Sequence, residues 1–476
     1  MKYDFDLAII GGGSAGLLAA KVAPRLSAKT VLIERDRLGG DCLWTGCVPS
    51  KTLLASAKVA NTLRHADRMG LPASDALIDT SKVWQRIRAV QEEIAADDDS
   101  PEAVAASGTE VLFGQAQTED GHTVRVGDRT LSARYILLCT GSRPTAPPIK
   151  GLEETGYLTS ETLFQLERAP ESLAIIGGGP IGVEMGQAMN RLGVKVTMLE
   201  AFDRILTRDE PSLAALLLDV LRHESVDVNL GVQIESAKGG DAKSLHGRID
   251  ADEQVWQAEE IFVAAGRAPN IESLNLEAAG VKTSPKGVEV DKHLRTSVPS
   301  IYAVGDCAGR YLFTHSAGAE AGVALRNMLY PGSQDAPTDV PWTTFTDPEL
   351  AHAGMTSDEA RKAYGEDEIC LHEYDISHGD RGRAEGLQTG NILVVATQSH
   401  KILGAHILAP SAGEMIGQFS LAMSQNIPLV PNFRDLIQVY PTYSTSLTHL
   451  TEQAVYEQLE RPFYKAVRRL GSLLGE

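Results

Sequence analysis

The feature that most constrains the fold is a glycine motif that occurs twice at a fixed distance. Gly11-Gly12-Gly13-Ser14-Ala15-Gly16 follows an apolar run over 7–10, and a small-residue helix is expected over 17–22. The motif recurs as Gly177-Gly178-Gly179-Pro180-Ile181-Gly182, after an apolar run over 173–176, at a constant offset of 166 residues. Each copy has the strand–turn–helix context in which such glycines let the backbone approach a pyrophosphate. The sequence therefore predicts two dinucleotide-binding units.

An acidic residue repeats with the same offset. Glu34 ends an expected strand over 30–33, and Glu200 ends one over 194–199. A carboxylate at this position binds ribose hydroxyls, and it repels the 2′-phosphate that distinguishes NADPH from NADH. Glu200 therefore favours NADH, while nearby Arg204 and Arg208 keep NADPH as the alternative.

Two cysteines follow the first unit. Cys42 and Cys47 lie five residues apart, and Pro49 begins a helical run from Ser50 to about residue 65. We expect Cys47 at a helix N-terminus, where the partial positive charge favours a thiolate. A disulfide across so short a loop adds little stability, which favours a redox role over a structural one. Two free cysteines near each other by chance are the alternative reading.

The string Gly39-Gly40-Asp41-Cys42-Leu43-Trp44-Thr45-Gly46-Cys47-Val48-Pro49-Ser50-Lys51 resembles the redox motif of the pyridine nucleotide-disulfide oxidoreductases. These FAD enzymes include dihydrolipoamide dehydrogenase, glutathione reductase and mercuric reductase. Four more segments resemble family motifs: 136–144 and 299–309 for the flavin, 262–270 for the end of the nicotinamide domain, and 340–349 for the start of the dimerisation domain.

The resemblance implies an α/β chain with two Rossmann-like domains, for FAD and NAD, and a C-terminal α+β dimerisation domain. We expect the first part of the FAD domain over 1–148 and the NAD domain over 149–272. The second part of the FAD domain is expected over 273–338, and the dimerisation domain over 339–476.

The resemblance also assigns residues. The flavin-binding residues are expected to be Gly11, Gly13, Ser14, Ala15, Gly16, Glu34, Arg35, Gly40, Asp41, Cys42, Lys51, Thr140, Gly141, Ser142, Gly305 and Asp306. The nicotinamide-binding residues are expected to be Gly177, Gly179, Gly182, Glu200, Gly266 and Arg267. Lys51 and Glu184 match a pair that lies beside the flavin ring, with a surface acid as the alternative reading of Glu184. Cys47 is implied as the flavin-proximal thiol, and Cys42 as the thiol that attacks the substrate.

One segment departs from the family pattern. Most of these disulfide reductases carry His-Pro-x-x-x-Glu near the C-terminus, and that His exchanges protons with the thiols of the partner subunit. Tyr440 takes the His position here, and Thr445 takes the Glu position. A phenol donates a proton but is a poor base at neutral pH. His449 is an alternative base, although a surface histidine is the expected reading. Mercuric reductases also have Tyr near this position, with a C-terminal cysteine pair, whereas Cys370 is the last cysteine of this chain.

We therefore expect a homodimer in which NADH reduces FAD, FAD reduces the Cys42–Cys47 disulfide, and the thiols reduce a small-molecule or protein disulfide. Tyr440 of one subunit would lie near the cysteine pair of the other. A metal ion, quinone or dye is the alternative acceptor, because such acceptors need no general base. A redox-sensing flavoprotein that binds a partner is the alternative of another class, and two complete nucleotide sites argue against it.

Charge and composition narrow the partners and the compartment. The net charge is −19, so nucleic-acid binding is not expected. The polar N-terminus and the few cysteines favour the cytoplasm. A basic tail over 463–474 is expected to pack on the dimer, with membrane contact as the alternative. No metal site is predicted. Cys139 and Cys307 are expected to be buried packing residues.

Overall fold

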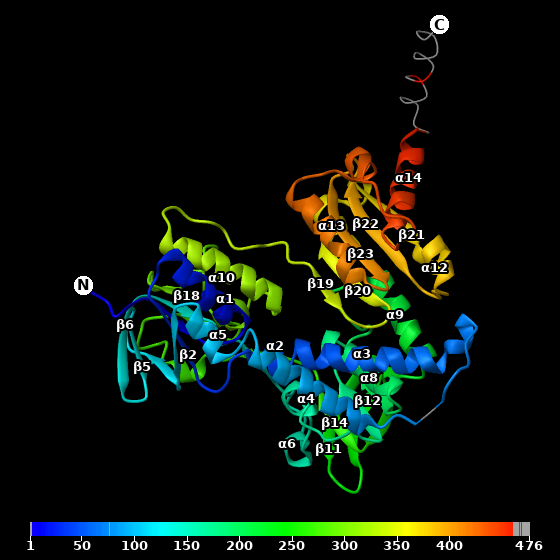
Figure 1. Cartoon of the computed structure of the whole chain (residues 1–476). Helices are drawn as coiled ribbons and strands as arrows, with labels where there is room; N and C mark the ends of the chain where they lie inside the picture. Colours follow the sequence, from blue (N-terminus) through cyan, green and yellow to red (C-terminus); the bar gives the residue numbers. More distant parts are fainter. Residues whose placement is uncertain (1, 76, 460–465, 467, 469–476) are drawn as a thin grey trace. The chain divides into compact units, whose positions relative to one another are not determined.

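A computed structural model describes residues 2–75, 77–459, 466 and 468 (Figure 1). Its contacts divide the chain into two compact units, and each unit is built from three separate stretches. The first unit comprises 1–56, 78–177 and 233–338, and the second comprises 57–77, 178–232 and 339–476. Each unit is described by itself below.

The centre of the first unit is a parallel sheet. Strand β1 (Phe5–Ile10) lies between β2 (Thr30–Glu34) and β6 (Arg129–Leu138). Beyond them, β3 (Thr109–Phe113) pairs with β2, and β18 (Ile301–Ala303) pairs with β6. Apolar side chains cover both faces of β1, as is typical of a parallel strand buried on both sides. Strands β4 (Ala116–Thr118) and β5 (Thr123–Val126) extend the sheet in antiparallel fashion along β6.

Two helices far apart in sequence cover one face of this sheet (Figure 1). Helix α1 (Ser14–Val22) contributes Leu17 and Ala20 to the same core cluster as Ala321 and Ala324 of α10 (Thr314–Leu329). Small residues let the two helices approach the sheet and each other closely. The predicted helix over 17–22 is thus confirmed, and it begins three residues earlier.

The turn between β1 and α1 requires glycine at two positions. Gly11 has φ +106°, and a Cβ there would lie 2.4 Å from the Cys139 carbonyl oxygen. A Cβ on Gly16 would lie 1.8 Å from the Gly11 carbonyl oxygen. Only glycine tolerates these approaches, so the motif places the N-terminus of α1 directly at the end of β1.

Further pairs of strands complete the first unit. β8 (Ser172–Ile176) runs parallel to β14 (Glu260–Val263), and β12 (Lys243–Ile249) forms a hairpin with β13 (Asp252–Ala258). β7 (Ser142–Pro144) pairs in antiparallel fashion with β15 (Arg267–Pro269). Helices α2 (Gly40–Trp44) and α4 (Thr80–Ala96) also belong to this unit, as does the first half of α3 (Cys47–Arg64).

The second unit contains α8 (Pro180–Arg191) and the parallel pair β9 (Lys195–Leu199) and β10 (Asp227–Asn229). Its largest sheet is antiparallel, with the order β19-β20-β23-β22-β21. These strands are Trp342–Thr344, Glu349–Gly354, Ile402–Ala409, Asn391–Thr397 and Ile369–Asp375. Helices α13 (Ala412–Ser424) and α14 (Thr445–Leu459) pack on it (Figure 1). The sequence predicts two of these strands, β22 and β23, and both helices; α14 begins two residues later than the sequence suggests.

Two buried imidazole rings and the partly buried ring of Trp342 stack on one another in this sheet. The Trp342 and His352 rings lie 3.6 Å apart at 12°, and the His406 ring lies 4.8 Å from that of His352. Burial lowers the pKa of His352 to about 2 and also lowers the pKa of His406. Both rings are therefore neutral in the folded unit.

Among the described residues, no helix is long and apolar enough to cross a membrane. The basic tail predicted over 463–474 lies outside the described residues, apart from 466 and 468.

Candidate active site

The two thiols lie on two helices that are connected by only two residues, Thr45 and Gly46. Cys42 lies in α2, and α3 begins at Cys47, as the sequence predicts. The loop is tightened by Thr45, whose N–H donates to the Asp41 carbonyl at 2.9 Å and whose hydroxyl donates to the Asp41 carboxylate at 2.5 Å. The Cys42 S–H donates a hydrogen bond to the sulfur of Cys47. The spacing therefore gives two free thiols in contact.

The two thiols differ in charge. The Cys42 hydrogen bond is the main cause that lowers the pKa of Cys47 to about 6, and Thr314 and the positive charge of Lys51 act in the same direction against burial. The pKa of Cys42 is raised, first because it donates to Cys47 and then by burial. At neutral pH, Cys47 is the thiolate and Cys42 the thiol.

Thr314 is a site residue that the motifs do not predict. It is the first residue of α10, and its Oγ1 lies 3.4 Å from the Cys47 sulfur. The contact spans 267 residues of sequence. No motif marks it, and the rings of its neighbours Phe313 and His315 stack on each other at 5.4 Å.

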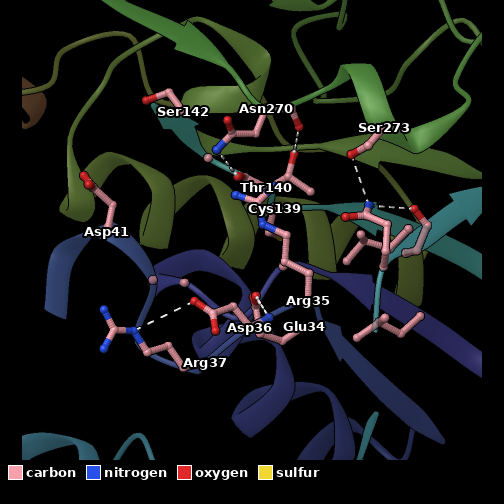
Figure 2. Close-up of a pocket in the computed structure, with 18 of the residues that line it drawn as sticks. Glu34, Arg35, Asp36, Arg37, Asp41, Cys139, Thr140, Ser142, Asn270 and Ser273 are labelled. Carbon is pink, nitrogen blue, oxygen red and sulfur yellow. Dashed lines mark hydrogen bonds and ion pairs between the residues drawn. The ribbon is translucent and has the colours of Figure 1, made fainter. Parts of the chain in front are cut away.

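A pocket of about 220 Å³ opens beside the glycine turn of the first unit (Figure 2). Nine predicted flavin-binding residues line it: Gly11, Gly13, Glu34, Arg35, Gly40, Asp41, Thr140, Gly141 and Ser142. Its lining also includes residues that the motifs do not single out, among them Trp44, Gln115, Asn270 and Ser273. Ser14, Ala15 and Gly16 lie in the first turn of α1, next to the pocket but not in its lining.

The glutamate at the end of β2 is held by the glycine turn. Glu34 accepts the Gly12 N–H at 2.6 Å and the Asp36 N–H at 2.9 Å. In the second unit, Glu200 accepts the Gly178 N–H, and it accepts the Phe202 N–H at 2.8 Å. The donors of the second turn, Gly178 and Phe202, each lie 166 positions after the corresponding donor of the first turn, as Glu200 does after Glu34. The sequence repeat is therefore also a repeat of hydrogen bonds.

Arg267 joins three predicted flavin-binding residues. It donates to the Ser142 hydroxyl at 2.7 Å and to the Asp41 carboxylate at 3.1 Å, and its Nε lies 3.7 Å from Asp306. Ser142 donates in turn to Asp306. Burial raises the pKa of Asp306, and Ser142 and Arg267 oppose that rise. The motif around Arg267 resembles the end of the nicotinamide domain, but within the first unit this arginine contacts residues that are predicted to bind the flavin.

The remaining predicted residues are distributed over both units. Gly177 has φ +114° and lies in the first unit with Gly266, Gly305 and Lys51, whereas Gly179, Gly182 and Glu184 belong to the second. Glu184 is 5% exposed and accepts the Phe345 N–H at 2.9 Å, so it is not a surface acid. Its pairing with Lys51 and the nicotinamide site stay predictions.

Both arginines near Glu200 have partners within the second unit. Arg204 donates to the carbonyl oxygens of Thr207 at 2.6 Å and of Asp209 at 3.3 Å. The Arg208 guanidinium lies 5.0 Å from the centre of the Trp342 ring.

Tyr440 lies on the surface of the second unit. It is 66% exposed, and its hydroxyl donates to the Asp380 carboxylate at 2.6 Å. Thr445, at the position of the family's glutamate, donates to the Val439 carbonyl at 3.2 Å. His449 stacks on Tyr374 at 5.4 Å, and its Nδ1 lies 3.6 Å from Glu452.

The glycine turn of the first unit and the N-terminus of α1 fit the pyrophosphate of FAD. Gly13 precedes α1 without a side-chain N-cap, so the first N–H groups of the helix can receive an anion. A Cβ on Gly40 would lie 2.7 Å from the Gly13 Cα, so glycine alone allows the loop to close over the turn. Gly179 precedes α8 in the second unit, also without a side-chain cap.

Two glycine turns, a polarised thiol pair and a C-terminal antiparallel sheet define a flavin-dependent oxidoreductase that uses a pyridine nucleotide. The chain matches the pyridine nucleotide-disulphide oxidoreductase family over residues 5–321 and the dimerisation domain of that family over 340–451. It belongs to this family.

Three relatives illustrate the range of the family. The chain is 32% identical to a mercuric reductase of Bacillus cereus, over 94% of this chain and 71% of the relative. It is 31% identical to a dihydrolipoyl dehydrogenase of Bacillus subtilis, over 93% and 96%. The structure is similar to the Cu(II) complex of the HOCl-induced flavoprotein disulfide reductase RclA from Escherichia coli, with TM-score 0.84 and 27% identity over 95% of this chain and 100% of that one.

Proposed function

We propose that this chain is a homodimeric, NADH-dependent flavin enzyme that reduces a disulfide through Cys42 and Cys47. The carrying observation is the contact between the two thiols, in which Cys42 donates to Cys47 and lowers its pKa to about 6. A polarised pair of this kind suits thiol–disulfide exchange, because one sulfur is held as a thiolate while the other stays protonated until it attacks.

The residues of the pair have separate roles in this proposal. Bound FAD supplies two-electron transfer between the pyridine nucleotide and the thiol pair. Cys42 attacks the acceptor disulfide as a thiolate and forms a mixed disulfide, and the first acceptor thiol leaves. Cys47 then attacks Cys42, which releases the second acceptor thiol and forms the Cys42–Cys47 disulfide. Lys51 supports the thiolate form of Cys47 through its charge.

NADH is favoured over NADPH by the surroundings of Glu200. Its carboxylate is fixed by the Gly178 and Phe202 N–H groups, where it would repel a 2′-phosphate. Arg204 and Arg208 are engaged by carbonyl oxygens and by Trp342, so neither is directed to a phosphate. We place the enzyme in the cytoplasm, where NADH is supplied.

The match to the dimerisation domain of the family supports the homodimer. An apolar segment supports it, because Ile437 is 95% exposed and Val439 is 76% exposed in the single chain. Side chains of this kind are normally covered by a partner. In the dimer, Tyr440 of one subunit would serve the thiol pair of the other.

Anaerobic titration with NADH tests the proposal. We expect the wild type to take up two equivalents per flavin, with a long-wavelength thiolate–flavin band before the flavin bleaches. C47S is the matched control, which should take up one equivalent without the band. Direct bleaching of the wild type by one equivalent would remove the thiols from the electron path.

A metal ion is the second candidate acceptor. Tyr440 in place of a histidine base favours it, since a phenol is a poor base and the reduction of a metal ion bound by thiolates needs no general base. The chain is also similar to a mercuric reductase and to a reductase whose structure holds Cu(II). Steady-state rates with a soluble disulfide and with Cu(II) or Hg²⁺ distinguish the two candidates. Rapid turnover with either acceptor would exclude a role as a redox sensor alone.

A further inference from the structure

Tyr440 is not a lone phenol, because Asp380 accepts its hydroxyl hydrogen. We infer that Asp380 and Tyr440 form a proton relay that replaces the histidine–glutamate pair of the family. The inference rests on the proposed reduction of a disulfide. Asp380 is a positioning and proton-holding residue in it, and Tyr440 is the group that would face the thiols of the partner subunit in the proposed dimer.

The carboxylate of the relay comes from a different element than in the family pattern. In that pattern the acid lies five residues after the base, where this chain has Thr445, and Thr445 donates to the Val439 carbonyl. Asp380 instead opens helix α12 (Asp380–Ala384), sixty residues before Tyr440, and its Oδ2 lies 2.6 Å from the phenol oxygen. Asp380 thus takes the place of the glutamate that the sequence motif lacks.

A phenol with a carboxylate behind it can act as a base. As the Cys42 S–H approaches the phenol oxygen, its proton moves to that oxygen while the phenol proton moves to Asp380. The products are a Cys42 thiolate, a neutral Tyr440 and a protonated Asp380. The thiolate attacks the acceptor sulfur, the acceptor S–S bond breaks, and the leaving thiolate takes the proton back along the same path. Electrons move only between sulfurs, and no phenolate is required.

The hydrogen bond to Asp380 also raises the pKa of Tyr440, which keeps the phenol protonated at neutral pH. Several other titratable groups lie near the relay on β21, the turn after it, α12 and α14: Tyr374, Asp375, His378, Arg381, Arg383, Glu385, Tyr443 and His449. Arg381 pairs with Glu385, and His378 lies 3.8 Å from Asp375.

The neighbouring pair Tyr443 and Glu385 provides a matched control. The Tyr443 hydroxyl donates to the Glu385 carboxylate at 2.5 Å, with the same chemistry as the Tyr440–Asp380 pair. Tyr443 lies three residues beyond Tyr440 and is not at the position of the family base. Any effect of losing a phenol–carboxylate bond on folding alone should appear in both pairs.

The experiment compares D380N, Y440F, the double variant, D380E and E385Q with the wild type as FAD-loaded dimers. We expect D380N and Y440F each to lower kcat for a soluble disulfide by about 10²-fold, the usual contribution of a positioned acid–base group. The double variant should be no worse than either single variant, because the two residues act as a unit. D380E should recover part of the activity, and E385Q should stay within about twofold of the wild type.

One further readout separates a proton relay from a structural role. Flavin reduction by NADH should be unchanged in both variants, because hydride transfer does not pass through the relay. Y440F removes only one oxygen atom, so it still tests the proton relay if D380N does not fold.

The outcomes distinguish the inference from the function on which it rests. Wild-type turnover of the disulfide with unchanged rates in D380N and Y440F overturns the relay and leaves the proposed function intact. Equal losses in E385Q and D380N also overturn it, because they indicate a structural effect. A wild type that reduces flavin but turns over no disulfide overturns both.

Discussion

Thr314 is the residue whose role is most directly measurable. Its hydroxyl lies 3.4 Å from the Cys47 sulfur, and it helps to hold the pKa of Cys47 at about 6. A hydrogen bond to a charged group stabilises it by about 1.5–3 kcal/mol, and one pKa unit corresponds to about 1.4 kcal/mol. T314V should therefore raise the pKa of the thiolate by about one unit.

The thiolate–flavin band measures this shift. In the reduced wild type the band should be present above pH 6 and lost as the pH falls through about 6, because Cys47 then takes up a proton. In T314V the midpoint should move to higher pH, and T314S, which keeps the hydroxyl, should stay near the wild type. An unchanged midpoint in T314V would exclude Thr314 as a donor to Cys47.

Residues of this kind show where prediction from sequence ends. The helix start at Cys47 could be predicted because Pro49 and the helical run are local. Thr314 and Asp380 could not, because their partners lie 267 and 60 residues away and no periodicity links them. Side-chain contacts between distant elements depend on tertiary packing, which the motifs do not encode.

At the scale of the element, the repeated glycine turn invites a matched pair of substitutions. Glu34 and Glu200 accept two N–H groups each, in turns that are equivalent in sequence. E34A should weaken the retention of FAD, with the protein losing flavin on dialysis. E200A should retain FAD and raise the KM for NADH by about tenfold, since the loss of one or two hydrogen bonds costs about 1–1.5 kcal/mol each.

Flavin content by absorbance and KM for NADH by steady-state rates test both variants in parallel. Each variant controls for the other, because the local damage to the turn is the same. Loss of flavin from E200A, with E34A fully loaded, would reverse the assignment of the two cofactors to the two turns.

The elements themselves were largely predictable. The strands β1 and β8, the helices after them and the acid at each strand end all follow from short-range patterns of glycine and apolar residues. The position of the Arg267 side chain could not be predicted. Its motif resembles the end of the nicotinamide domain, whereas its side chain donates hydrogen bonds to Asp41 and Ser142. A strand pairing of β15 with β7 carries it there, and such pairing is a property of the fold rather than of the motif.

At the scale of the whole molecule, the buried imidazoles make stability sensitive to acid. The pKa of His352 is depressed to about 2, against about 6.5 in the unfolded chain, and the pKa of His406 is depressed too. Below about pH 6.5 the unfolded chain binds protons that the folded unit does not. Each histidine then lowers the free energy of unfolding by up to about 1.4 kcal/mol per pH unit.

Asp209 acts in the opposite direction. Its pKa is raised to about 6 by burial, so between about pH 6 and pH 4 the folded unit binds a proton first and is stabilised. The two histidines together exceed this effect. The melting temperature at pH 5 should thus lie below that at pH 7.5, as measured by calorimetry on the FAD-loaded protein.

H352F should reduce this acid sensitivity, because phenylalanine keeps the stack on Trp342 without titrating. It should also lower the melting temperature at pH 7.5, since the imidazole N–H donates to the Gly354 carbonyl at 2.8 Å. H223Q, on the exposed end of α9 (Pro211–His223), is the control and should change neither value. Equal acid sensitivity in H352F and the wild type would contradict this account.

The division of each unit into three stretches has a consequence for synthesis on the ribosome. The chain passes between the units five times, and α1 receives its cover only when α10, at residues 314–329, has been made. At about 5–20 residues per second, some 15–60 s separate the emergence of these helices. During that interval the nascent chain exposes the apolar face of its first sheet to solvent, so its yield in the cell should depend on chaperones that bind it before residue 338 is translated.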